Sequence, residues 1–233
     1  MKEPVFDLHQ KLAAEFTGTG FLVGTVVGSG IMAERLSDGN VALALLANGV
    51  ATGAILAVLI IMFAPISGAH LNPAVSLVMR LNGTLSTPEF FAYIASQVAG
   101  GLVGVMVAHA MFAEMLFQVS GTVRNGAPQW FAEVVATFGL VLTILLTLRS
   151  WPRAVGPCVG LYIASAYWFT ASTSFANPAV TIARALSDTF SGIRPLDVGP
   201  FLLAEITGAI LALYAARLFL ARSAPPSEET GGV

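Results

Sequence analysis

Long apolar stretches recur six times along this sequence and leave little room for a water-soluble fold. A helix needs about 20 apolar residues to cross the hydrocarbon core of a bilayer, and these stretches meet or approach that length. Of the 233 residues, 56% are hydrophobic and only 10% are charged, which is too little polar surface for a soluble globule. We therefore predict an all-α membrane protein with six transmembrane helices. The expected spans are 12–33, 41–64, 90–111, 131–148, 154–170 and 199–220, of which the fifth is the shortest.

The tripeptide Asn-Pro-Ala occurs twice, each time in a short segment of small residues between apolar stretches. Asparagine caps free backbone N–H groups at a helix start, and proline is tolerated in the first turn because its missing donor costs nothing there. We predict that each copy opens a short half-helix, too short to span the membrane. The two boxes are Asn72, Pro73 and Ala74, and Asn177, Pro178 and Ala179.

The two halves of the chain resemble one another in an ordered series of three matches. Residues 14–19 match 132–137, residues 72–77 match 177–182, and residues 96–100 match 204–208. Three spans per repeat is an odd number, so the second repeat is expected to be inverted in the membrane. We predict one domain over residues 1–222, with repeats at about 11–114 and 129–222, and a disordered tail over 223–233 because of its composition.

The basic residues orient the predicted spans. Cytoplasmic connections of membrane proteins carry an excess of lysine and arginine. One side, which has both termini, carries Lys2, Lys11, Arg80, Arg149, Arg153, Arg217 and Arg222, and the other carries Arg35, Arg124, Arg184 and Arg194. We therefore expect a multi-pass protein of the cell membrane (plasma or inner membrane) with both termini in the cytoplasm.

The paired half-helices predict a pathway for solutes. Non-helical backbone at mid-membrane depth is tolerated only where it is buried in protein or lines a water-filled path. Both half-helices would start at the midplane, so their positive dipole ends and the amides of Asn72 and Asn177 converge there and oppose cations. We expect neutral polar solutes and water to pass.

Several features together resemble the aquaporin and aquaglyceroporin family of major intrinsic proteins. They are the six spans, the two boxes, the run Ser-Gly-Ala-His-Leu-Asn-Pro-Ala-Val at 67–75, and the acidic residues Glu15 and Glu133 in the first and fourth spans. The resemblance covers residues 12–220. It implies a right-handed helical bundle with an hourglass pore, passive transport, and a homotetramer with one pore per subunit.

The resemblance also locates a selectivity filter, and this sequence departs from the family pattern there. The family normally has an arginine directly after the second box, where this chain has Val180. The other filter positions fall on Thr52, Ser165 and Ser174, which predicts a wide, uncharged constriction. A shift of register in the fifth span would instead bring Tyr167 or Trp168 to the pore. Arg184 lies one helical turn, or roughly 6 Å, beyond Val180, and we expect it in the outer vestibule; the alternative is that it folds back into the filter.

We expect a passive channel for small uncharged polar solutes: water, glycerol and other polyols, urea, and undissociated metalloid or organic acids. One alternative is a water-selective aquaporin. An alternative of another class is an ion-coupled secondary transporter, since acidic residues within spans, here Glu15 and Glu133, can relay protons. Their symmetric placement and the resemblance favour a structural role, in which each carboxylate accepts hydrogen bonds from the loop of its own repeat. His70 is expected to support the first loop, or to line the cytoplasmic pore mouth.

Other functional classes find little support in the sequence. No nucleophile, base and orienting group cluster along the chain, so we do not expect an enzyme. We expect no cofactor and no metal site. The formal net charge is −2 and no basic tract is present, so nucleic acid is not an expected partner. The expected partners are the lipid bilayer, small neutral solutes and further copies of the chain.

Overall fold

The computed structural model describes residues 6–221, and all the helices predicted from sequence lie within this range. The tail predicted for residues 223–233 lies outside it. The fold is all-α, as predicted. The long helices are α1 (Leu8–Leu36), α2 (Val41–Ser67), α4 (Thr87–Met111), α5 (Ala127–Ser150), α6 (Val155–Phe169) and α8 (Pro195–Leu220); the short ones are α3 (Pro73–Leu81), α7 (Pro178–Arg184) and the 3₁₀ turn η1 (Pro152–Ala154).

Helix α6 differs from the other long helices in its length. Helices α1, α2, α4, α5 and α8 are each long and apolar enough to cross a membrane. Helix α6 has 15 residues, which corresponds to about 22 Å against a hydrocarbon core of about 30 Å. The turn η1 directly precedes it and extends the segment. The fifth span is therefore the shortest, as the sequence predicts.

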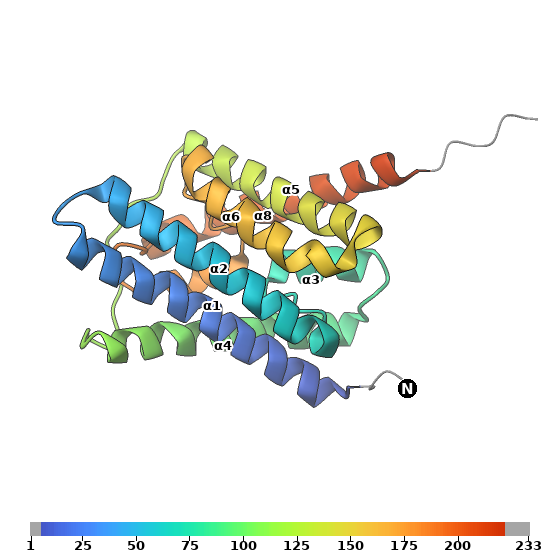
Figure 1. The fold of residues 1–233 in the computed structure, drawn as a ribbon, viewed down its shortest axis with the longest axis horizontal. Coiled ribbons are helices and arrows are strands. Elements are labelled where there is room, and N and C mark those ends of the chain that lie inside the picture. The colour runs from blue at the N-terminus through green and yellow to red at the C-terminus, as the bar shows by residue number, and fades with distance from the viewer. Residues whose placement is uncertain (1–5, 222–233) are drawn as a thin grey trace, which may run out of the picture.

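The two halves of the chain pack in the same way. Helix α1 packs against α2 and α4, and the corresponding α5 packs against α6 and α8. Helices α2 and α6 join the halves, and the half-helices α3 and α7 contact α8 and α4 of the opposite half. Helix α1 begins and α8 ends at the same end of the bundle (Figure 1). This arrangement brings the two Asn-Pro-Ala boxes together inside the bundle.

Glycines allow the helices of each pair to approach closely. A Cβ atom added at Gly53 of α2 would meet the carbonyl oxygen of Gly160 of α6, and one added at Gly160 would meet that of Gly53. Between α4 and α1, a Cβ atom added at Gly104 would meet the carbonyl oxygen of Gly20, and one added at Gly20 would approach that of Gly100. Small residues are the usual means by which helix backbones come close in lipid, and here they do so within one bundle.

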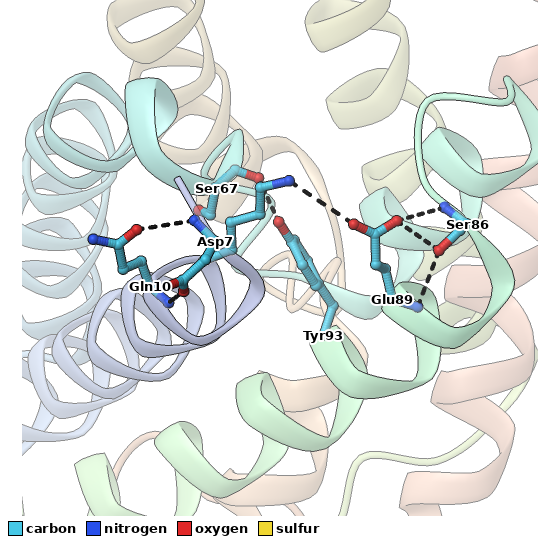
Figure 2. A network of polar contacts seen from close by, with 7 residues as sticks. Asp7, Gln10, Ser67, Ser86, Glu89 and Tyr93 are labelled. Carbon is cyan, nitrogen blue, oxygen red and sulfur yellow. Dashed lines mark hydrogen bonds and ion pairs between the residues drawn. The ribbon is translucent and has the colours of Figure 1, made fainter. Parts of the chain in front are cut away.

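Helices α1 and α4 begin side by side with the same type of cap. Asp7 accepts a hydrogen bond from the backbone N–H of Gln10 at 2.9 Å, and the Gln10 side chain accepts one from the N–H of Asp7 at 2.9 Å (Figure 2). Ser86 and Glu89 form the equivalent capping box on α4. Such boxes satisfy N–H groups that have no partner within the helix, so both helices have defined starts.

Candidate pore and solute pathway

Each Asn-Pro-Ala box opens a half-helix in the way the sequence predicts. The Asn72 side-chain oxygen accepts a hydrogen bond from the Ala74 N–H at 2.8 Å, and that of Asn177 accepts one from the Ala179 N–H at 3.0 Å. Proline occupies the first helical position in both α3 and α7. Both asparagines are buried and have extended backbone, as helix-capping residues do.

The same two asparagines also connect the boxes to each other through hydrogen bonds. The Asn72 amide nitrogen donates to the carbonyl of Ala176 at 2.7 Å, and the Asn177 amide nitrogen donates to the carbonyl of Leu71 at 2.8 Å. An asparagine amide has two N–H groups, so each keeps a second donor beyond this cross-link. Because each box binds the loop of the other repeat, the two helix N-termini are held at one level of the bundle.

The carboxylate of Glu15 holds the first loop in place. It accepts hydrogen bonds from the Ser67 hydroxyl at 2.6 Å, the His70 N–H at 2.9 Å and the Leu71 N–H at 2.6 Å. The Tyr93 hydroxyl donates to the carbonyl of Ser67 at 2.9 Å, just before the loop (Figure 2). A carboxylate is an acceptor at both oxygens, which suits a loop that presents several donors to one point.

The carboxylate of Glu133 holds the second loop in the symmetric way. It accepts hydrogen bonds from the N–H groups of Phe175 at 2.9 Å and Ala176 at 2.7 Å, and Glu205 accepts one from the Asn177 N–H at 3.2 Å. Both glutamates are fully buried. The carboxylates of Glu15 and Glu133 thus contact the loop of their own repeat, which agrees with the structural role and leaves them little freedom as proton relays.

Both loops have backbone conformations that L-residues rarely adopt. The φ angles are positive at Ala69 (47°) and Leu71 (49°) in the first loop, and at Ser174 (52°) and Ala176 (48°) in the second. Such conformations persist where the surroundings over-determine them. The glutamate contacts provide that constraint.

The loops present unused hydrogen-bond acceptors to an internal cavity. Within residues 6–221, the carbonyl groups of Gly68, Ala69 and His70 in the first loop, and of Ser174 and Phe175 in the second, accept no hydrogen bond. All five residues line the cavity. Backbone carbonyls buried without a partner are costly unless water or a solute satisfies them, so these oxygens are suited to accept from passing O–H groups.

The cavity has a volume of about 750 Å³ and runs past both boxes. Its wall is mostly apolar and includes Asn72 and Asn177. Among the residues the structure describes, no aspartate or glutamate lines it, whereas Arg153 and Arg184 do. The positive helix N-termini and these two arginines make the cavity unfavourable for cations.

The predicted filter residues are only partly brought together. Thr52, Ser174 and Val180 are buried and line the cavity. Ser165 does not: it is exposed, and its hydroxyl donates to the carbonyl of Tyr162. The expected place of Ser165 in the wall is therefore wrong.

The rotation of α6 explains this correction. Its cavity-lining residues include Val159, Ile163 and Tyr167, spaced four apart, while Ser165 lies two residues from either neighbour and so about 200° around the helix. Tyr167 takes the place expected for Ser165, and its hydroxyl lies 3.1 Å from the Thr52 hydroxyl. Trp168 is 51% exposed and does not line the cavity.

Arginine also reaches the wall, although Val180 stands directly after the second box. Arg184 is only 2% exposed and lines the cavity, with its guanidinium carbon 3.4 Å from the centroid of the Phe175 ring. The sequence predicts Arg184 in the outer vestibule, and the structure shows its side chain buried against Phe175 at the cavity wall. The wall is therefore not free of arginine. Arg184 lies one helical turn beyond Val180, and its long side chain reaches across that distance to the wall.

Gln97 has no role assigned from the sequence, and it donates to Glu15 at 2.7 Å and to Ser76 at 2.9 Å. His70, which we expect to support the first loop or to line the pore mouth, lines the cavity with a ring nitrogen 3.1 Å from the Ser76 hydroxyl. Gln97 and Glu205 occupy equivalent positions in the matched segments 96–100 and 204–208. The alignment of these two segments could have identified both residues as loop contacts, because equivalent positions of an inverted repeat face equivalent loops.

Comparison with known proteins agrees with this geometry. The family model described as "Major intrinsic protein" matches residues 4–170, which is well over half of the chain. The chain belongs to the major intrinsic protein family. Aquaglyceroporin AqpS of Rhizobium meliloti (strain 1021) is 53% identical over 97% of this chain and 96% of its own length. Glycerol uptake facilitator protein-like 6 of Lactiplantibacillus plantarum is 30% identical over 90% of this chain and 97% of its own.

A solved structure supports the fold. The aquaglyceroporin from Plasmodium falciparum matches with a TM-score of 0.72 at 21% identity, covering 92% of this chain and 98% of that one. Members of the major intrinsic protein family are channels and not enzymes, so this chain is a multi-pass membrane channel and not an enzyme.

Proposed function

We propose that this major intrinsic protein is a passive channel for small uncharged polar solutes: water, glycerol and other polyols, urea, and undissociated metalloid or organic acids. One observation carries the proposal, namely a single cavity that both boxes line and that no acidic side chain enters, within the part of the chain the structure describes. Helix N-termini at its centre oppose cations, and free loop carbonyls accept hydrogen bonds from hydroxyl groups.

The choice of solutes larger than water rests on Val180 and on the relatives. A valine directly after the second box is smaller than the arginine usual in the family, and it carries no charge. Two relatives are named as an aquaglyceroporin and as a glycerol uptake facilitator-like protein. We infer that the pathway admits polyols as well as water.

A water-selective channel is the second candidate, because two bulky side chains lie in the cavity wall where the sequence predicts only small side chains. Tyr167 and Arg184 both line the cavity, and both narrow it relative to a wall of Thr52, Ser165, Ser174 and Val180. The transporter alternative is weaker, because Glu15 and Glu133 are bonded to their loops and do not line the cavity.

We also propose a homotetramer in the cell membrane, with one pore per subunit and both termini in the cytoplasm. Many large apolar side chains are exposed on the outer surface of the bundle, among them Phe21, Leu161 and Leu203, where lipid or neighbouring subunits would cover them. The excess of basic residues on the side of the termini supports the orientation.

Stopped-flow light scattering on proteoliposomes tests the solute range. The panel runs from water through glycerol and urea to a weak acid at two pH values, with protein-free liposomes as the baseline. We expect entry of water, glycerol and urea well above that baseline. High water permeability with no glycerol or urea entry would favour the water-selective channel, and saturable uptake driven by a proton gradient would revive the transporter.

The variant Val180→Arg tests the role of position 180 in the same assay. A guanidinium placed one turn before Arg184 narrows the wall and adds a second charge, so we expect glycerol and urea entry to fall by about tenfold, which corresponds to about 1.4 kcal/mol of added barrier. Water entry should fall less, because water is smaller. Unchanged entry of the large solutes would show that Val180 does not lie at the constriction.

A further inference from the structure

Glu205 of α8 is a buried carboxyl group that takes no part in the wall of the pathway. It is fully buried and does not line the cavity. Its Oε1 accepts hydrogen bonds from the Asn177 N–H at 3.2 Å and from the Thr181 hydroxyl at 2.6 Å. Its Oε2 has no hydrogen-bond partner within residues 6–221. A buried carboxylate needs donors to offset its lost hydration, so this environment is unfavourable for a negative charge.

A second buried carboxyl group, that of Glu133, lies across the crossing of α5 and α8. Gly208 lies one turn after Glu205 in α8. A Cβ atom added at Gly208 would meet the backbone of α5 at Val134, the residue next to Glu133. The two glutamates also bind three consecutive N–H groups of one loop, at residues 175–177: Glu133 binds the first two and Glu205 binds the third. Two carboxyl groups therefore converge on one short segment.

Basic side chains near the two glutamates form no ion pair with them. They are Arg184 of α7 and Arg124 of the loop before α5, and their hydrogen bonds go to backbone carbonyl groups. The nearby Tyr162 hydroxyl of α6 also donates to a backbone carbonyl. The ion pairs found within residues 6–221 involve neither glutamate. Like charges repel strongly in a medium of low dielectric constant, so two ionised carboxylates would destabilise this segment.

The first repeat has an amide at the equivalent place. Gln97 is the counterpart of Glu205 in the matched segments, and its side-chain nitrogen donates to Glu15 at 2.7 Å. An amide can donate a hydrogen bond to a carboxylate, whereas a second carboxylate cannot. A carboxylic acid that keeps its proton has one O–H donor and acts as the amide does.

We propose that Glu205 is held as a neutral carboxylic acid whose O–H group donates to the Glu133 carboxylate. The carbonyl oxygen of the Glu205 acid accepts from Asn177 and Thr181, and the pair carries one negative charge instead of two. Glu205 is thus a positioning residue, because it holds the Asn177 N–H, and with it the second box, without touching a solute. This inference goes beyond the proposed function and does not depend on which solutes pass.

Infrared spectroscopy of the full chain in an alkyl maltoside, a detergent without ester carbonyl groups, tests the protonation directly. A neutral carboxylic acid has a carbonyl stretch at higher frequency than the bands of a carboxylate. We expect this band at neutral pH in the wild type and its loss in Glu205→Gln. Glu34→Gln, which replaces an exposed acid, is the control and should leave the band unchanged. Absence of the band in the wild type, or its full intensity in Glu205→Gln, would show that Glu205 is ionised and would overturn the proposal.

A pair of substitutions at position 205 tests the positioning role. Glutamine keeps an acceptor for Asn177 and donates to Glu133 through its amide, so Glu205→Gln should match the wild type in thermal midpoint and in water permeability. Glu205→Leu removes both the acceptor and the donor, so its midpoint should fall and water permeability should drop about fivefold. If Glu205→Gln loses as much as Glu205→Leu, the negative charge is required and the proposal fails. Should Glu205→Leu not fold, the infrared band and Glu205→Gln still decide.

Discussion

At the scale of single residues, buried carboxylates determine the shape of the pathway. Glu133 accepts hydrogen bonds from two adjacent N–H groups of the second loop while that backbone has positive φ angles at Ser174 and Ala176. Without an acceptor on this side, the loop would leave donors unpaired in a fully buried place. The carbonyls that line the cavity therefore depend on a side chain that never touches the solute.

The substitution Glu133→Gln should destabilise the protein. A glutamine amide offers one oxygen where the carboxylate offers two, so one loop N–H loses its partner and faces an NH₂ group, at a cost of about 1–3 kcal/mol. The midpoint of thermal unfolding in detergent, followed by circular dichroism, should fall. Glu34→Gln is the control, because Glu34 is exposed. Equal midpoints for Glu133→Gln and the wild type would contradict the loop-support role.

At the scale of helices, close crossings set the width of the bundle. Helices α2 and α6 meet where Gly53 faces Gly160, and both contribute residues to the cavity wall. Because a Cβ atom at either glycine would meet backbone, the crossing has no flexible side chain that can move aside. The distance between Thr52 and Tyr167 follows from this crossing.

The substitution Gly160→Ala should push α2 and α6 apart. Overpacking of this kind costs about 1–3 kcal/mol, so the thermal midpoint should fall, and solute permeability should change with it. Gly199→Ala in α8 is the matched control, because a Cβ at Gly199 meets nothing within 4 Å. If both variants unfold at the same temperature as the wild type, the crossing tolerates more volume than the packing indicates.

At the scale of the whole molecule, the six long helices of residues 6–221 form two sets of three, so the chain returns to the end of the bundle where α1 begins. Helix α1 begins and α8 ends at the same end of the bundle, and the exposed outer surface is rich in large apolar side chains. One chain encloses the whole cavity, but its apolar outer surface must be covered by lipid or by neighbouring copies. The number of subunits and the orientation of the chain in the membrane are therefore tested on the whole protein.

We expect the detergent-solubilised protein to have four times the chain mass of 24.2 kDa by light scattering, corrected for bound detergent. In sealed inside-out vesicles, protease should remove epitope tags from both termini, and right-side-out vesicles should protect both tags. A monomer mass would contradict the tetramer. Removal of one tag only would contradict the even number of membrane crossings.

Local chemistry was enough to predict the spans and the half-helices. Apolar length defines a membrane helix wherever it occurs, so α2 begins at Val41 as expected, and α6 is one residue shorter at each end than predicted. The Asn-Pro pairs carry their own capping chemistry, so α3 and α7 begin directly after Asn72 and Asn177. The paired segments of the repeat also placed Glu15 and Glu133 opposite their loops.

Which side chains form the wall was decided only by tertiary packing. The rotation of α6 put Tyr167 in the wall and Ser165 outside it, because a difference of two residues turns a helix by about 200°. Arg184 entered the wall because Phe175, from a separate segment, supports its guanidinium. By itself the sequence determined that this protein is a membrane channel built around two boxes, since hydrophobic length and capping act locally. Helix rotation and side-chain direction depend on contacts between distant segments, and only the folded bundle determines those.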